Sequence, residues 1–215
     1  MLDSPLLLVG RSSSHFTRVT TMFASELGLP WTLQPVHRLL DRDPASFGGH
    51  PALKIPTLLL RGAPLYGAEN ICRKLSELAG RAGDPLLVFP ERLHDDSARN
   101  AQELVWVAMG AQVQLRLGQT DSPSEHLLKV RAGLQGALSW LEGQLDEVLL
   151  TLPSPRQLSL LELTLFCLVD HLRFLPPFPL DTYPRLLRFA EAYGERESAR
   201  RTPFRFDTRS PQEAR

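Results

Sequence analysis

Strand and helix patterns alternate over about the first eighty residues of the chain, and only helix patterns follow Pro90. The apolar run at 6–9 is typical of a buried strand. From Phe16 the apolar residues take helical spacing, and Gly28 stands where a glycine commonly ends a helix. Strands that alternate with helices fold as a layered α/β unit. We therefore expect one α/β unit at the start of the chain and an all-helical region after it.

The remaining elements are predicted from periodicity and from turn residues. Further strands are expected at 31–36, 57–60 and 65–66, and helices at 69–78, 94–117, 124–149, 159–174 and 181–199. Residues 80–90 hold two glycines and two prolines, which is typical of a linker. These boundaries predict an N-terminal domain at 1–79, a linker at 80–90 and an all-α C-terminal domain at 91–215.

One of the predicted helices has an explicit start signal. Ser159 and Glu162 have the spacing of a capping box, in which each side chain satisfies a free backbone N–H of the first turn. Residues 163–169 are apolar nearly all round, so this helix is expected to form the core of the second domain. The wider segment 158–175 also carries charged residues, which favours a buried helix over a membrane span.

Charge and cysteine content limit the kinds of partner. The chain has 24 basic and 24 acidic residues, and without a basic surplus no nucleic-acid partner is expected. The arginine-rich end at 196–215 is interleaved with acidic residues and is predicted to be a solvated tail. The two cysteines, Cys72 and Cys167, are too few for a secreted disulfide scaffold and favour a cytoplasmic protein. The histidines lack metal-ligand spacing, so no metal site is expected.

Several segments resemble, in order and spacing, the glutathione S-transferase superfamily. They are residues 14–19 together with 25–30, 50–56 (HPALKIP), 65–75, 159–162 (SLLE) and 183–186 (YPRL). The resemblance covers nearly the whole chain. It implies a thioredoxin-like α/β N-terminal domain followed by an all-α helical domain. It also implies glutathione as co-substrate, a small electrophile as the second substrate, and a homodimer.

The resemblance implies a reaction in which the glutathione thiolate attacks an electrophile. A free thiol has a pKa of about 8.5, so the site must stabilise the thiolate at neutral pH. By resemblance, Ser14 takes the catalytic serine position, and Ser13 is the neighbour that some classes use instead. A serine at a helix N-terminus offers both a hydroxyl donor and the positive end of the helix. The alternative is that these serines only cap the helix.

The segment around Pro56 is similar to the family's cis-proline segment. A cis bond would leave the backbone N–H and C=O of Ile55 free to pair with the extended tripeptide, as an added strand does. The alternative is a trans proline that opens a strand. Lys54 could pair with a glutathione carboxylate, or it could be an ordinary solvated lysine.

One part of the glutathione-binding motif is degenerate. The family usually has an acidic residue and a serine at the start of the helix expected at 69–78, where they hold the γ-glutamyl group. Gly67 and Ala68 stand at these positions here. The backbone N–H of Ala68 could still contribute. Glu69 could substitute for the acid, although a glutamate in a first turn usually just complements the helix dipole.

Two functions from different classes follow from these observations. The first is a glutathione transferase that conjugates the glutathione thiolate to a small electrophile. The second is a non-catalytic module of the same fold that has lost glutathione binding and serves in binding or interaction. A glutathione-dependent disulfide reductase would need a cysteine, or a suitably poised hydroxyl, in the first loop, and the loop has no cysteine. No membrane partner is expected for any of them.

Overall fold

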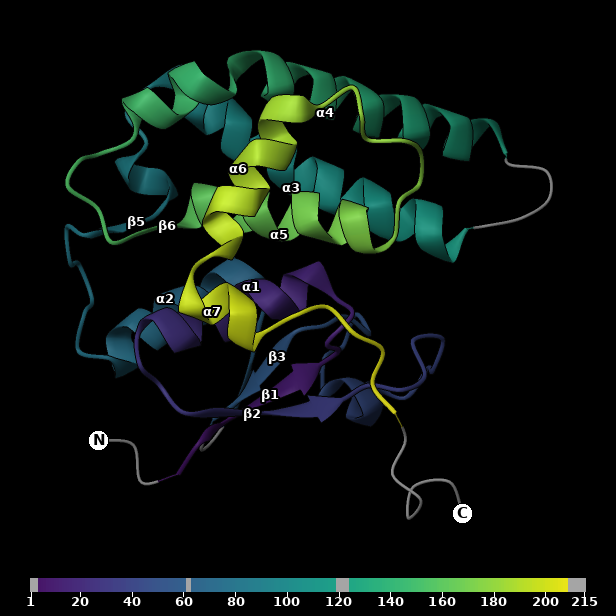
Figure 1. Cartoon of the computed structure of the whole chain (residues 1–215). Helices are drawn as coiled ribbons and strands as arrows, with labels where there is room; N and C mark the ends of the chain where they lie inside the picture. The colour runs from purple at the N-terminus through teal and green to yellow at the C-terminus, as the bar shows by residue number, and fades with distance from the viewer. Residues whose placement is uncertain (1–3, 61–62, 119–123, 209–215) are drawn as a thin grey trace. The chain divides into compact units, whose positions relative to one another are not determined.

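The computed structural model describes residues 4–60, 63–118 and 124–208, and Figure 1 shows it as a ribbon. Contacts divide the chain into two compact units. The first is Met1–Gly83 together with Arg196–Arg215, and the second is Asp84–Glu195. The end of the chain is therefore grouped with its beginning.

A four-stranded mixed sheet forms the centre of the first unit. Its strands are β1 (Leu6–Gly10), β2 (Trp31–Pro35), β3 (Thr57–Leu59) and β4 (Pro64–Tyr66). Their order across the sheet is β2-β1-β3-β4. Strand β1 pairs in parallel with β2 and antiparallel with β3, and β3 pairs antiparallel with β4. All four strands are predicted from the sequence, and the thioredoxin-like α/β fold expected for this part of the chain is confirmed.

Helices α1 (His15–Glu26) and α2 (Ala68–Leu78) lie side by side on one face of this sheet (Figure 1). The predicted end of α1 is confirmed: the N–H of Gly28 donates to the carbonyl of Ser25, and the next N–H reaches back to Ala24. On the other face, Val9 packs with Val36 and with Phe47 of the short 3-10 helix η1 (Pro44–Phe47). The sheet is thus buried on both sides.

The second unit is built from helices. They are α3 (Asp96–Leu117), α4 (Glu125–Thr151), α5 (Leu160–Phe174) and α6 (Pro184–Gly194). Helix α3 packs against both α4 and α5, and α5 packs against α6. As predicted, α5 is the core helix: Leu163, Cys167 and Leu168 are completely buried.

The sequence pattern misses two very short strands. Strand β5 (Leu87–Val88) lies within the segment predicted as a linker, and it pairs in parallel with β6 (Leu158–Ser159). A 3-10 helix, η2 (Pro90–Arg92), follows β5. Strands of two residues are too short to produce an alternation, so periodicity does not detect them.

The predicted capping box at the start of α5 is wrong. Ser159 is at the N-cap position, but its hydroxyl makes no capping hydrogen bond. Its backbone belongs to the β5–β6 pair instead. The carboxylate of Glu162 accepts two hydrogen bonds of 2.8 Å from Arg156, which directs it away from the N-cap backbone. A nearby arginine has therefore replaced the reciprocal pair that the spacing suggests.

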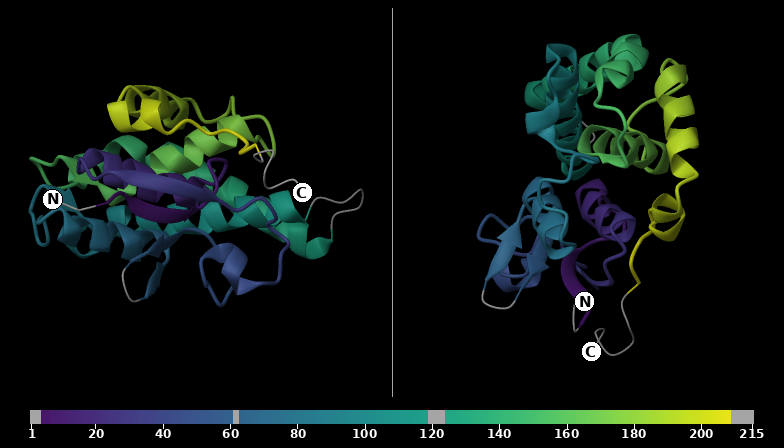
Figure 2. Two further views of the ribbon diagram at one scale, coloured as in Figure 1. Left: turned by 90° about the horizontal axis from the view of Figure 1, so that it is seen from below. Right: turned by 90° about the vertical axis from the view of Figure 1, so that its left-hand side faces the viewer.

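The helix expected at 181–199 is two helices, because α6 ends at Gly194 and α7 (Glu197–Arg201) begins after Arg196. Helix α7 packs against α1, and the chain then runs on along the first unit (Figures 1 and 2). Ser198, Ala199 and Thr202 are buried. The expectation of a solvated tail is therefore wrong for 196–208, and the rest of that prediction, 209–215, lies outside the described residues.

Candidate functional site

Pairing within the sheet brings three of the predicted site segments to one edge. Val9, next to the end of β1, lies opposite Thr57, the first residue of β3. Thr57 also lies opposite Tyr66, the last residue of β4. The loop that follows β1, the residues that precede β3 and the turn that follows β4 are consequently neighbours. Ser13 and Ser14, Ile55 and Pro56, and Gly67 to Glu69 belong to these three segments.

Ser14 is the N-cap residue of α1. Its Oγ accepts a hydrogen bond of 3.3 Å from the backbone N–H of Thr17, and its own N–H donates to the carbonyl of Arg11 at 3.1 Å. The capping role suggested by the sequence is thus present. A serine hydroxyl is also a donor, and accepting the Thr17 N–H leaves its hydrogen available. Ser14 is half-buried, as is Ser13 before it.

Gly10 lets the strand and the helix of this loop approach closely. A Cβ atom at Gly10 would lie 2.5 Å from Oγ1 and 2.6 Å from Cγ2 of Thr17, which is a severe overlap. The same Oγ1 accepts the N–H of Arg11 at 3.3 Å. Thr17 thereby ties the end of β1, the loop and the first turn of α1 together, and this fixes the position of Ser14.

The peptide bond between Ile55 and Pro56 is cis, which is the geometry that the functional interpretation of the sequence requires. Pro56 is buried and Ile55 is half-buried. Within the part of the chain that the structure describes, neither the N–H nor the C=O of Ile55 makes a hydrogen bond. A donor and an acceptor of the main chain are thus open at the edge of the sheet.

The start of α2 is open in the same way. Its N-cap residue, Gly67, has φ 85° and ψ 133° and offers no side-chain cap. A positive φ of this size is readily adopted only by glycine. The first backbone N–H of α2 that makes a hydrogen bond is that of Ile71, which donates to the carbonyl of Gly67. Among the described residues, the backbone N–H groups of Ala68, Glu69 and Asn70 therefore have no acceptor. Three donors and the positive end of the helix macrodipole therefore meet at this edge.

Glu69 and Lys54 are placed less favourably for the roles that the sequence offers them. Oε1 of Glu69 accepts hydrogen bonds from Nε and from one terminal nitrogen of Arg73, at 3.1 and 2.8 Å, one turn along α2. Its carboxylate is thus already paired. Lys54 is exposed, and nothing in the structure assigns it a ligand.

A pair of rings that the sequence interpretation missed lies beside the cis-proline segment. The ring centroids of His50 and Tyr66 are 4.3 Å apart, and the Tyr66 hydroxyl donates to the carbonyl of Gly49 at 2.8 Å. Burial, followed by the nearby Lys54 charge, lowers the pKa of His50, which keeps the imidazole neutral at pH 7. Nδ1 accepts the N–H of Ala52 at 3.1 Å and so stabilises the loop before Ile55.

The C-terminal segment also reaches the loop that carries the serines. The backbone N–H of Ser12 donates to Oδ2 of Asp207 at 2.9 Å. Further along α1, the guanidinium of Arg18 stacks on the ring of Phe204, 4.3 Å from the ring centroid. No local pattern could predict contacts between residues so distant in the chain.

The first comparison with known proteins concerns the part of the chain that contains this site. Residues 13–78 match the family described as "Glutathione S-transferase, N-terminal domain". Over these residues the chain is similar to the N-terminal domain of glutathione S-transferases. The match confirms the resemblance to the glutathione S-transferase superfamily that the sequence motifs indicate. A comparison with curated protein sequences gives no match.

Solved structures of glutathione S-transferases are similar over more than nine tenths of the chain. The enzyme of Methylobacterium radiotolerans, in complex with glutathione sulfonate, has a TM-score of 0.74 at 21% identity, over 96% of this chain and 99% of that one. A glutathione transferase family member from Pseudomonas fluorescens, with bound glutathione, gives 0.73 at 24% identity, over 92% and 98%. Poplar glutathione transferase F1 gives 0.64 at 17% identity, over 93% and 96%. The chain therefore has the glutathione S-transferase fold, as predicted.

The described residues of this glutathione S-transferase-fold chain contain no candidate membrane span and no candidate metal cluster. None of its described helices combines the length and the apolar character that crossing a bilayer requires. No three histidine, cysteine, aspartate or glutamate side chains among these residues are grouped so that they could hold a metal ion.

Proposed function

We propose that the first unit binds glutathione and that the chain is a glutathione transferase, which conjugates the glutathione thiolate to a small electrophile. The observation that carries the proposal is the set of open groups at one edge of the sheet. The backbone of Ile55, the first N–H groups of α2 and the Ser14 hydroxyl have unused hydrogen-bonding capacity, within the residues that the structure describes. These groups suit an extended peptide that carries a carboxylate at one end and a thiol near its centre.

Each open group has a role in the proposed complex. The N–H and C=O of Ile55, held in place by Pro56, pair with the main chain of the tripeptide in the manner of an added strand. The N–H of Ala68 and the positive end of α2 receive the γ-glutamyl carboxylate. Lys54, which is exposed, is available to another carboxylate of the ligand.

The thiol then lies near the start of α1. The Ser14 hydroxyl accepts from Thr17 and donates its hydrogen to the sulfur, so capping and thiolate stabilisation are compatible. A hydrogen bond to the charged form and the positive end of α1 both lower the thiol pKa from about 8.5. A larger fraction is therefore thiolate, the nucleophilic form, at neutral pH. Ser13, the adjacent residue, is the alternative donor.

Solved structures support glutathione as the ligand. The proteins of Methylobacterium radiotolerans and Pseudomonas fluorescens contain glutathione sulfonate and glutathione, respectively, and share this fold. The predicted homodimer and the cytoplasmic location are parts of the same proposal, and both stay predictions.

A specific observation favours the second candidate, a binding module without catalysis. Gly67 and Ala68 provide no side-chain carboxylate or hydroxyl at the start of α2, and Glu69 is paired with Arg73. Loss of one charge-assisted hydrogen bond costs about 1.5–3 kcal/mol. The affinity for glutathione would then be about one to two powers of ten lower than with the complete motif.

Calorimetric titration with glutathione, together with a conjugation assay on a chromogenic aryl halide, separates the two candidates. The transferase proposal expects saturable binding and turnover that falls by about one to two powers of ten in Ser14→Ala and is retained in Ser14→Thr, which keeps the hydroxyl. Saturable binding without turnover in the wild type would overturn the transferase activity but not glutathione binding. An absence of both binding and turnover at about 10 mM glutathione would overturn the whole proposal for this site and favour the module.

A further inference from the structure

A recess lies in the first unit, between the start of α1, strand β2 and the C-terminal segment. It is lined by Arg11 and Ser12 from the loop before α1, by Trp31 and Leu33 from β2, and by Arg201 and Arg205 from the end of the chain. Figure 2 shows this end of the chain running beside the first strand and helix of the unit. The recess is separate from the open groups of Ile55 and Ala68.

The charged side chains of the lining are all basic. Four of the lining residues are arginines, the three above and Arg18, and no aspartate or glutamate is among them. Nε of Arg11 is shielded from solvent and has no hydrogen-bond acceptor among the residues that the structure describes. Arg205 is exposed and forms no ion pair with any residue that the structure describes. Two guanidinium groups are thus available to an anion.

The other two arginines are already engaged. Arg201 pairs with Glu197 on α7 at 2.5 Å, and both side chains are exposed. Arg18 is buried, donates to the carbonyl of Ala199 at 3.3 Å and stacks on Phe204. Both still contribute positive potential. Glu197 and Asp207, which accepts the N–H of Ser12, offset a part of it.

One wall of the recess is apolar and fixed. Trp31 and Leu33 alternate with exposed residues along β2, so they share one face of this edge strand. The indole N–H of Trp31 donates to Oγ of Ser25 at 3.0 Å, which holds the ring in place. Ser12 adds a small polar residue to the lining. The space suits a compact anion rather than an extended peptide.

We propose that this recess binds a phosphate or sulfate group, free or as part of a small ester, and that the anion joins the loop at Arg11 to the C-terminal segment at Arg205. Guanidinium groups match oxyanions geometrically, and a tetrahedral oxyanion has enough oxygen atoms to serve donors from two segments at once. A carboxylate has only two oxygens. The two walls come from opposite ends of the chain, so an anion bound between them ties these ends together.

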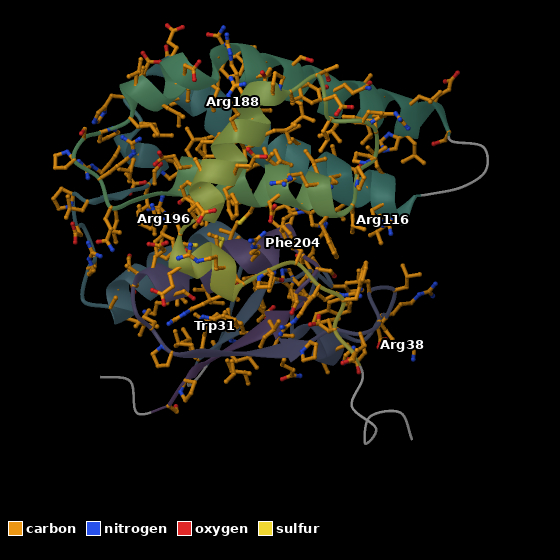
Figure 3. All side chains as sticks on the ribbon, viewed as in Figure 1. Trp31, Arg38, Arg116, Arg188, Arg196 and Phe204 are labelled. Atoms are coloured by element: carbon orange, nitrogen blue, oxygen red, sulfur yellow. The ribbon has the colours of Figure 1, made fainter. Side chains whose placement is uncertain are left out.

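The test is calorimetric titration of the full chain, without glutathione, with inorganic phosphate and separately with sulfate, at constant ionic strength set by chloride. We expect saturable binding that weakens about tenfold in Arg205→Gln and in Arg11→Gln. Arg38→Gln is the matched control, because Arg38 is an exposed arginine of the same unit outside the recess (labelled in Figure 3). It should bind like the wild type.

Two further readouts locate the anion. Phosphate should change the tryptophan fluorescence of the wild type, and this change should disappear in Trp31→Phe while calorimetric binding persists. Amide exchange should slow at 202–207 when phosphate is present. Equal weakening in all three arginine variants, no saturable binding of either anion, or acetate binding as tightly as phosphate would each overturn the proposal. Binding of only one of the two tetrahedral anions would identify it as the ligand class.

Discussion

Arg196 is joined to Glu26 by two parallel hydrogen bonds of 2.8 Å, although 170 residues separate them in the chain. Glu26 lies in the last turn of α1, and Arg196 immediately precedes α7. The hydroxyl of Ser198 donates to the same carboxylate. The side chain of Glu26 is only 12% exposed, so this pair is better shielded than the surface pairs of the chain. It anchors the C-terminal segment on the first unit.

Removal of this anchor should destabilise the protein. In Glu26→Gln the carboxylate charge is lost, while the partly buried guanidinium of Arg196 keeps its own. We expect the free energy of unfolding to fall by about 2 kcal/mol, because charge-assisted hydrogen bonds contribute more than neutral ones. Urea unfolding measures the change. Glu77→Gln is the control: its exposed pair with Lys74 should contribute less than about 1 kcal/mol. Equal effects of the two variants would refute the anchoring role.

The same carboxylate should make the attachment sensitive to acid. Burial raises the pKa of Glu26, but hydrogen bonds from Arg196 and Ser198 and the charge of Arg196 together lower it below the ordinary 4.5. A carboxyl with a lowered folded-state pKa contributes stability that is complete above the unfolded-state value and is lost as pH falls through the folded-state value. The stability difference between wild type and Glu26→Gln should therefore shrink between about pH 6 and pH 3. The pKa values of Asp41 and Asp95 are also lowered, but both proteins contain these residues, so their contributions to the pH dependence cancel in the difference.

Two substitutions at Ser14 separate capping from chemistry. Ser14→Asp keeps a capping acceptor and removes the donor, whereas Ser14→Ala removes both. Ser14→Ala should lower stability by about 1 kcal/mol, and Ser14→Asp should leave it nearly unchanged. Both should reduce conjugation by about one to two powers of ten at pH 7, equivalent to the loss of a hydrogen bond to a charged group. Thermal unfolding and initial rates measure the two effects. If Ser14→Asp retained full activity, the hydroxyl would not be the thiolate donor.

The sequence predicts those parts of the fold that depend on neighbouring residues. The apolar run of β1, the helical spacing of α1 and the cap at Gly28 are local features, and the structure contains all of them. Predictions fail where a distant or competing partner decides. Glu162 pairs with Arg156 rather than with the backbone at Ser159. The two-residue strands β5 and β6 exist only through their mutual pairing.

The features of the candidate site fall into the same two groups, those with a local sequence signal and those that depend on distant residues. Ser14, Ile55 and Pro56 are predicted from motif spacing, because a serine at a helix start and an X-Pro bond are both visible in the local sequence. The contact of Asp207 with Ser12 and the recess at Arg11 depend on a chain end that folds back over the first unit. The arginines there are visible in the sequence, but their interleaved acids give the pattern of a solvated tail. The buried side chains of Ser198 and Thr202 and the pair of Arg196 with Glu26 show that the segment is docked.

The degenerate start of α2 offers a gain-of-function test. Ala68→Ser introduces a hydroxyl at the first residue of the helix, whose side-chain position is buried beside the open N–H groups. We expect glutathione affinity to rise by about three- to tenfold, since a neutral hydrogen bond contributes about 0.5–1.5 kcal/mol. Calorimetry measures it. Gly67→Ala is the contrasting variant: at φ 85° any side chain is strained, so it should cost about 1–3 kcal/mol of stability. Unchanged affinity in Ala68→Ser would place the γ-glutamyl group elsewhere.

The close approach of β1 to α1 should make Gly10 intolerant of any side chain. In Gly10→Ala the new Cβ would lie 2.5 Å from Oγ1 of Thr17, and Thr17 is buried, so the helix or the strand must move. We expect a loss of about 1–3 kcal/mol, the usual range for an overpacked core. Activity should also fall, because Thr17 holds the loop that carries Ser14.

The control is Gly136→Ala in α4, where a Cβ meets nothing within 4 Å. There the better helix propensity of alanine should raise stability by about 0.5–1 kcal/mol. Urea unfolding of both variants should therefore give effects of opposite sign, and a stable, fully active Gly10→Ala protein would contradict the proposed coupling.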